Sequence, residues 1–311
     1  MRLDDTPESQ NVEDRRDDGP ASPGGGFGGG GGFGGGGGFG LPIGGGMGGL
    51  GVIVVIGAAL FLGIDPMALL SGMQQSPPPR EYQQPRQAQP SQTGRPVGRD
   101  DEMRRFVGRV LGSTEEVWRE QFPAQLNQQY REPTLVLFTG RVNSACGSAT
   151  AASGPFYCPG DMKVYIDLSF YEMLRTRFRA PGDFAQAYVI GHEVGHHIQR
   201  LLGILAKVQE RKRQVSQVEA NALQVRVELQ ADCFAGAWAF HANRKRAILE
   251  PGDVEEALRA AAAIGDDTLQ GGAARAETFT HGTAAQRQRW LKRGLQTGSL
   301  RDCDTFSARE L

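Results

Sequence analysis

Glycine dominates one stretch of this chain. Of the 44 glycines among its 311 residues, 20 lie within residues 24–51. A segment with so few side chains buries too little apolar surface to offset the entropy lost on ordering. The chain therefore cannot form one compact domain of its full length. We expect a disordered polar and Gly-rich segment over residues 1–42.

An apolar run follows the glycines. Residues 41–64 carry no charged side chain, and GVIVVIGAALFLGI at residues 51–64 is strongly apolar. Because a bilayer-spanning helix needs about 20 such residues, we expect a transmembrane helix at residues 43–65. A short buried helix is the alternative. The Pro- and Gln-rich residues 66–99 are typical of an extended stalk, which leaves residues 100–311 for one folded domain.

Charge is balanced along the chain, which carries 34 Lys and Arg against 35 Asp and Glu, a net charge of −1. Affinity for nucleic acid rests on an excess of positive charge facing the phosphates. We therefore expect no nucleic-acid partner.

Helical patterns dominate residues 100–311. Apolar residues recur at helical spacing, and capping residues mark several helix starts, including a capping box of Asp253 with Glu256. Two short runs of β-branched and aromatic residues indicate strands. The expected helices cover 101–125, 168–179, 183–201 and 216–243 and begin again at Asp253 and Thr283, and the expected strands are 134–138 and 163–167. This pattern predicts an α+β fold, mainly helical with a small sheet.

The strongest chemical signal is His192-Glu193-Val194-Gly195-His196. Side chains four apart lie on one helix face, so His192 and His196 can reach one metal ion. Glu193 lies beside that face and can act on a water at the metal, as in the His-Glu-x-x-His motif of zinc metalloproteases. The next residue, His197, lies about 100° further round the helix, and we interpret it as structural.

A catalytic zinc ion usually has three protein ligands. The elongated motif, with a third His six residues after His196, is excluded because that position is Leu202. A second helix must supply the ligand, and we expect Glu228 to do so. Asp232, one turn later, is expected to accept a hydrogen bond from a ligating His. Asp232, Glu219 and His241 remain alternatives for the third ligand.

These motifs resemble the bacterial family of putative neutral zinc metallopeptidases. The similarity extends over nearly the whole chain, through the Asn11–Arg16 start, the Gly-rich linker and apolar helix, GPFYCP at 154–159, HEVGHHIQ, ELQADCFAG at 228–236 and FTHG at 279–282. The resemblance implies a membrane-anchored, zincin-like peptidase that binds one Zn²⁺. It implies His192, His196 and Glu228 as ligands and Glu193 as the catalytic residue.

The expected reaction is peptide-bond hydrolysis by a zinc-activated water, with Glu193 as general base. The tetrahedral intermediate needs a further hydrogen-bond donor to its oxyanion, and the candidates are His281, Tyr188 and Tyr165. His281 precedes a predicted helix that carries Arg287, and this spacing resembles a His-x-x-x-x-x-Arg element of other membrane peptidases with a Glu ligand. A structural loop histidine is the alternative.

Four cysteines allow three disulfide pairings. Nearness in sequence favours Cys146 with Cys158, which leaves Cys233 with Cys303. Disulfides need an oxidising compartment, so we expect an N-inside anchor with the catalytic domain outside the cytoplasm. Four reduced thiols in a cytoplasmic domain are the alternative.

The sequence thus predicts a single-pass membrane protein of the cell envelope that cleaves a protein or peptide substrate. The small-residue run Ala145–Gly154 is a candidate edge on which a substrate strand could lie. Two alternatives remain, a non-catalytic, zinc-stabilised adaptor domain and a cytoplasmic peptidase.

Overall fold

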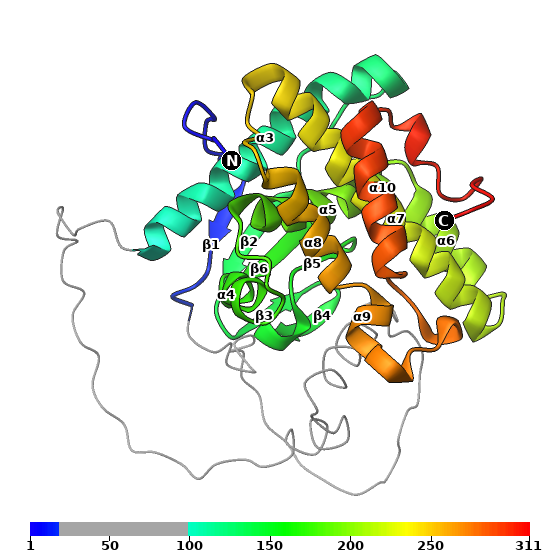
Figure 1. Ribbon diagram of the computed structural model, residues 1–311. Coiled ribbons are helices and arrows are strands. Elements are labelled where there is room, and N and C mark those ends of the chain that lie inside the picture. Colours follow the sequence, from blue (N-terminus) through cyan, green and yellow to red (C-terminus); the bar gives the residue numbers. More distant parts are fainter. Residues whose placement is uncertain (19–98) are drawn as a thin grey trace, which may run out of the picture.

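The computed structural model describes residues 1–18 and 99–311. Its helices and strands are, in chain order, β1 (Val12–Asp14), α3 (Arg99–Leu126), β2 (Thr134–Phe138), β3 (Arg141–Ser144), β4 (Gly147–Thr150), β5 (Phe156–Cys158), β6 (Lys163–Asp167), α4 (Ser169–Thr176), α5 (Asp183–Leu201), α6 (Ile204–Lys212), α7 (Gln217–Arg246), α8 (Asp253–Ala263), α9 (Asp266–Gln270) and α10 (Ala284–Thr297). The expected α+β fold, mainly helical with a small sheet, is confirmed (Figure 1).

The main sheet has four strands in the order β1-β2-β6-β5. β2 pairs in parallel with both β1 and β6, and β5 pairs antiparallel with β6 at the edge. The two central strands, TLVLF and KVYID, are buried along most of their length, which explains their continuous apolar patterns. Strands β3 and β4 form a separate antiparallel hairpin.

Residues 1–18 belong to the folded body. Val12 of β1 lies opposite Leu135 of β2, and the blue strand borders the green sheet in Figure 1. Leu3 and Thr6 are buried, and the Met1 α-amino group lies 2.7 Å from the Asp183 carboxylate at the start of α5. The expected disorder over residues 1–42 is therefore wrong for residues 1–18. It failed because three strand residues, with one hydrophobic residue among them, leave no periodic pattern.

The other expected segments before residue 99 lie outside the described residues. They are the remainder of the Gly-rich segment, the transmembrane helix at 43–65 and all but the last residue of the stalk at 66–99, where α3 already begins. Within residues 1–18 and 99–311, no helix combines the length and the apolar character that a membrane crossing requires.

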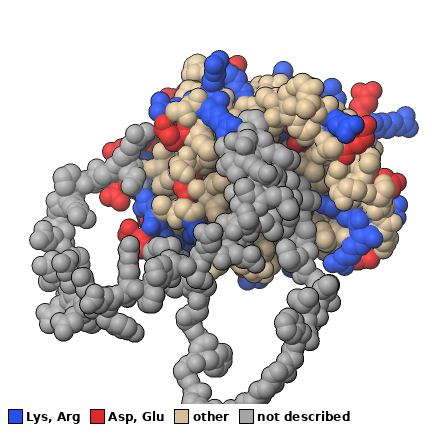
Figure 2. Space-filling model, turned by 90° about the horizontal axis from the view of Figure 1, so that it is seen from below, with Lys and Arg blue, Asp and Glu red and all other residues tan. Residues whose placement is uncertain are grey.

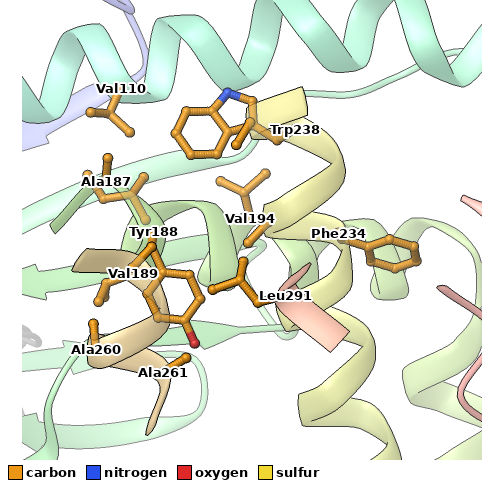
Figure 3. Packing of buried hydrophobic residues seen from close by; sticks show 14 of the residues in the cluster. Val110, Ala187, Tyr188, Val189, Val194, Phe234, Trp238, Ala260, Ala261 and Leu291 are labelled. Atoms are coloured by element: carbon orange, nitrogen blue, oxygen red, sulfur yellow. The ribbon is translucent and has the colours of Figure 1, made fainter. Parts of the chain in front are cut away.

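The core lies where α3, α5, α7, α8 and α10 meet one another and the sheet. Figure 3 shows Leu291 of α10 beside the ring of Tyr188, Val194 of α5 between Leu291 and Trp238, and Trp238 of α7 below α3. Tyr188, Val194, Trp238 and Leu291 are at most 1% exposed. The Trp238 indole N–H donates to Ser113 Oγ at 3.1 Å, so this buried side chain has a partner for its one polar group.

Helix positions agree with the sequence patterns to within a few residues, but one cap differs. Thr283 caps α10 in a capping box with Gln286, close to the predicted start. The expected box of Asp253 with Glu256 is wrong, because Gly252 is the N-cap residue of α8 and has a φ of 99°. Asp253 instead accepts a hydrogen bond from the Glu250 backbone N–H, at 2.8 Å.

Both favoured disulfides are present. Cys146 is bonded to Cys158, and Cys233 is bonded to Cys303 across 70 residues of chain. The second bridge joins the C-terminal tail to α7 directly beside Asp232.

Candidate metal centre

The helices that carry the two motifs cross at close range. A Cβ atom on Gly195 of α5 would fall 2.8 Å from the Ala231 carbonyl oxygen of α7, and one on Gly191 would fall 2.9 Å from the Trp238 ring. A side chain at either position would push the helices apart. The glycine of the HEVGH motif therefore has a packing role, which is to bring that motif against residues 228–232.

Three candidate ligand atoms converge at this crossing. Nε2 of His192 lies 3.1 Å from Glu228 Oε2, and Nε2 of His196 lies 3.4 Å from the same oxygen. A tetrahedral zinc ion with bonds of about 2.0–2.1 Å would hold its ligand atoms roughly 3.4 Å apart. The spacing of this group therefore fits zinc.

Electrostatics at the crossing favour a cation. Burial works against protonation of His192, but Asp232 and Glu228 outweigh it and raise the pKa of His192 to about 10. The pKa of Glu228 is held well below its ordinary value, against the effect of burial, by His196 and His192 and more weakly by His281. The pocket thus supplies negative charge where a metal ion would need it.

Each of the three side chains is oriented by a partner. His192 Nδ1 lies 2.7 Å from Asp232 Oδ1, which is the contact expected from the sequence. His196 Nδ1 lies 2.9 Å from Gln199 Oε1, and Gln224 donates to Glu228 Oε1 at 2.8 Å. These contacts aim both Nε2 atoms and Glu228 Oε2 at the common point.

Asp232 is the centre of a buried charged network. Its two oxygens accept hydrogen bonds from the Arg287 guanidinium, each at 2.9 Å, and Oδ1 accepts another from the Tyr188 hydroxyl at 2.6 Å. Burial opposes ionisation, but Arg287 and His192 lower the pKa of Asp232 to about 2. Asp232 is therefore a carboxylate with four donors, and it acts on the centre through His192.

Glu193 lies at the centre without belonging to the ligand group. The three side chains that could hold a metal ion there are His192, His196 and Glu228. Glu193 is 7% exposed, and burial raises the pKa of its carboxyl group. A carboxylate that binds protons more readily than usual suits a general base.

His281 lies in the turn before α10. Its Nδ1 is 3.2 Å from Asp266 Oδ1. The next residue, Gly282, packs against Val225 and Leu229 of α7, where a Cβ would fall 3.2 and 3.3 Å from their methyl groups. Those two residues flank Glu228 in the sequence, so the turn lies against the helix that carries the expected third ligand.

The remaining candidates lie elsewhere. His197 is fully buried, with Nδ1 3.0 Å from the Tyr157 hydroxyl and Nε2 2.6 Å from the Arg131 carbonyl oxygen, and burial lowers its pKa to about 4. It is structural, as expected.

Glu219 caps the start of α7, and His241 contacts the Gly298 carbonyl oxygen. The Tyr165 hydroxyl donates to Asp161, and Tyr188 is engaged by Asp232.

Comparison with known proteins gives the family. A model of the family described as "Putative neutral zinc metallopeptidase" matches residues 1–306. The chain belongs to this family. The matched range includes residues 1–18, and the structure also places these residues in the folded body.

Relatives in two bacteria match most of the chain. "Uncharacterized protein YpfJ" of Escherichia coli strain K12 is 44% identical over 311 residues, covering 98% of this chain and 99% of the relative. "Uncharacterized protein Rv2575" of Mycobacterium tuberculosis strain H37Rv is 43% identical over 267 residues, covering 81% of this chain and 86% of the relative. No solved structure matches the chain.

Sequence reasoning missed three polar partners of the site. Gln199 lies three residues after His196, and Gln224 lies four residues before Glu228, so helical spacing could have identified both. Asp266 is 15 residues from His281 and on another element, and no sequence signal connects the two.

Proposed function

We propose that this chain is a zinc-dependent endopeptidase. The observation that carries the proposal is the convergence of His192, His196 and Glu228 on one point, with Glu193 beside them and outside the ligand group. Family membership supports a peptidase. The proposal includes one Zn²⁺ per chain and a zincin-like arrangement of α5 behind the sheet.

The protein residues have separate tasks. When bound, zinc would lower the pKa of a coordinated water to about 7 and polarise a carbonyl group. Glu193 takes the proton of the attacking water and delivers it to the leaving amine. Asp232, Gln199 and Gln224 keep the three ligand side chains oriented. His281 is the proposed donor to the oxyanion.

An extended peptide would bind along β5. This strand is the edge of the main sheet, and Tyr157 within it contacts His197 of α5. Backbone hydrogen bonds from such an edge can hold a substrate strand. The run Ala145–Gly154, which includes β4 of the hairpin, stays a second prediction for the same role.

A non-catalytic adaptor would need a closed metal site with four protein ligands. Around this point, the ligand group among residues 1–18 and 99–311 consists of three side chains. A general base at Glu193 would have no use in a structural site. The open fourth position therefore favours the enzyme.

The test is zinc content and peptide cleavage by the purified full chain and its Glu193→Gln variant. We expect the variant to bind zinc normally and to lose on the order of 10²–10⁴-fold in kcat. The exposed Glu255→Gln on α8 is the matched control and should cleave like the parent. Zinc-dependent cleavage by Glu193→Gln within a few-fold of the parent contradicts the mechanism.

We propose that the whole described body lies in one oxidising compartment of the cell envelope. Two disulfides support an oxidising compartment. The pairing of β1 with β2 supports a topology in which residues 1–18 and 99–311 lie on the same side of any membrane. A single crossing by residues 43–65 with an N-inside start would separate them, so this proposal replaces that topology.

Labelling with a membrane-impermeant maleimide tests the compartment. Asp17→Cys and Ser307→Cys place one thiol at exposed sites near each end of the described chain. We expect equal labelling of both variants in intact bacterial cells, with lysed cells as the control. Labelling of Ser307→Cys alone would restore the single crossing. Labelling of neither variant would favour the cytoplasmic alternative.

A further inference from the structure

One carboxylate holds the turn that contains His281. Asp266 Oδ2 accepts the backbone N–H groups of Thr280, His281 and Gly282 at 2.7, 2.6 and 2.9 Å. Its other oxygen, Oδ1, lies 3.2 Å from His281 Nδ1. Asp266 therefore fixes both the backbone and the ring of the same residue.

The held turn faces the metal centre's third ligand. Gly282 has a φ of 88° and packs against Val225 and Leu229, on either side of Glu228. A residue with a side chain would be strained at that φ and would press on α7. The backbone conformation at Gly282 and its support by Asp266 thus set how closely His281 approaches α7.

The ring contact decides which nitrogen is free. An imidazole whose Nδ1–H donates to a carboxylate presents Nε2 on the opposite side of the ring, and the carboxylate stabilises the doubly protonated ring that can donate Nε2–H. The Asp266 side chain is 7% exposed and the His281 side chain is 27% exposed. The Asp266 carboxylate is therefore the more buried partner, and part of the His281 ring remains accessible.

We propose that Asp266 is the positioning residue for His281, and that it directs the His281 Nε2–H to the oxyanion formed when water adds to the substrate carbonyl. This inference rests on the proposed peptidase function. In this proposal, Asp266 at the start of α9 orients the His281 ring, which lies in the turn before α10. The need for such a donor follows from the charge that develops on the carbonyl oxygen.

The neighbouring residue provides a matched control. Asp267 also accepts backbone N–H groups, from Ala284 at 2.7 Å and from Thr268 at 3.0 Å. Its contacts include no imidazole among those that the structure gives. Asp266→Asn and Asp267→Asn thus each weaken carboxylate-to-backbone contacts on α9, but only the first weakens a contact with His281.

The experiment is a double-mutant cycle on the zinc-loaded full chain with Asp266→Asn, His281→Ala and the double variant. We expect kcat to fall about 10–100-fold in Asp266→Asn and about 10²–10³-fold in His281→Ala. The double variant should match His281→Ala within about 3-fold, because the proposal has Asp266 act on catalysis through His281. Asp267→Asn should retain the parent kcat, and thermal unfolding of all four variants separates loss of folding from loss of catalysis.

Nitrogen-15 NMR of labelled histidines supplies a readout that does not depend on activity. In the parent and in Asp267→Asn, Nδ1 and Nε2 of His281 should both carry a proton, as donation from Nε2–H requires, and the proton on Nδ1 should no longer be fixed in Asp266→Asn. Additive losses of kcat in the cycle, or an unchanged protonation pattern of the ring in Asp266→Asn, overturn the proposal. If the zinc-loaded parent cleaves no peptide, the peptidase function fails and the oxyanion role fails with it, while the NMR result still decides whether Asp266 fixes the ring.

Discussion

The candidate metal centre and the N-terminal segment, residues 1–18, are held in place by different kinds of interaction. At the centre, the candidate ligands come from two helices in which four-residue spacing places side chains on one face, and the buried Asp232 carboxylate is paired with His192 and Arg287. The N-terminal segment is held by a three-residue strand, a few buried side chains and partly exposed ion pairs. Chemistry that follows helical spacing can be predicted from sequence, whereas a short strand paired with a partner more than a hundred residues away cannot.

The largest expected effect is at Asp232. Asp232→Asn leaves the buried Arg287 guanidinium without its carboxylate, which should lower the free energy of unfolding by about 3–5 kcal/mol. Zinc affinity should fall about 10–100-fold because His192 loses its orienting acceptor. Urea unfolding and competition with a chelator measure the two effects.

A second substitution sharpens that test. Adding Arg287→Met to Asp232→Asn removes the unpaired cation and should recover part of the stability, but not the zinc affinity. A cost below about 1 kcal/mol for Asp232→Asn alone would mean that the network at the centre is not stabilising in the way the contacts indicate.

A smaller effect is expected at Leu3, which is 6% exposed in the N-terminal segment. Leu3→Ala should cost about 2–3 kcal/mol in urea unfolding and leave zinc affinity unchanged. Asp4→Ala, whose side chain is 89% exposed, is the control and should stay within about 0.5 kcal/mol of the parent. If Leu3→Ala and Asp4→Ala have equal free energies of unfolding, residues 1–18 do not contribute to the folded body.

The smallest effect is electrostatic and links β1 to β6. Lys163 Nζ donates to Glu13 Oε1 at 2.6 Å, and this contact lowers the pKa of Glu13 despite partial burial. A lowered pKa gives stability that is fully present above the unfolded value of 4.5 and is lost as pH falls through the folded value. Since the pair is partly exposed and screened by solvent, we expect Glu13→Gln to remove between a few tenths and about 1 kcal/mol at pH 7.

Comparing the parent with Glu13→Gln across pH isolates the Glu13 carboxylate, which pairs with both Lys163 and Arg15, because the other titrating groups are common to both proteins. The difference in unfolding free energy should shrink towards zero as pH falls below 4.5. If the difference in unfolding free energy instead grows as the pH falls, the pKa of Glu13 is not lowered in the folded protein, and the prediction is wrong.

How far the sequence predicts this protein depends on how local each feature is. The helix boundaries around residues 183–201, the two central strands and the shared helix face of His192 and His196 could be read from periodicity and spacing, since four residues of helix always return to the same face. Glu228 was one of several candidates for the third ligand, and the crossing of α5 and α7 brings its carboxylate to the two histidines. Residues 1–18, the edge strand β5 and the hairpin of β3 and β4 could not. Short strands gain their stability from pairing partners rather than from their own residues.

The sequence by itself determined the α+β composition of the domain, the residue types of the candidate ligands and their spacing on each helix. The tertiary structure decided which second helix meets HEVGH, how Gly195 allows that approach, and which buried groups orient the ligands. It also decided that Asp266 contacts His281 and that residues 1–18 pack in the same folded body as residues 99–311. The physical reason is that side chains distant in sequence come within hydrogen-bond reach only when the packing of the whole core brings their backbones together.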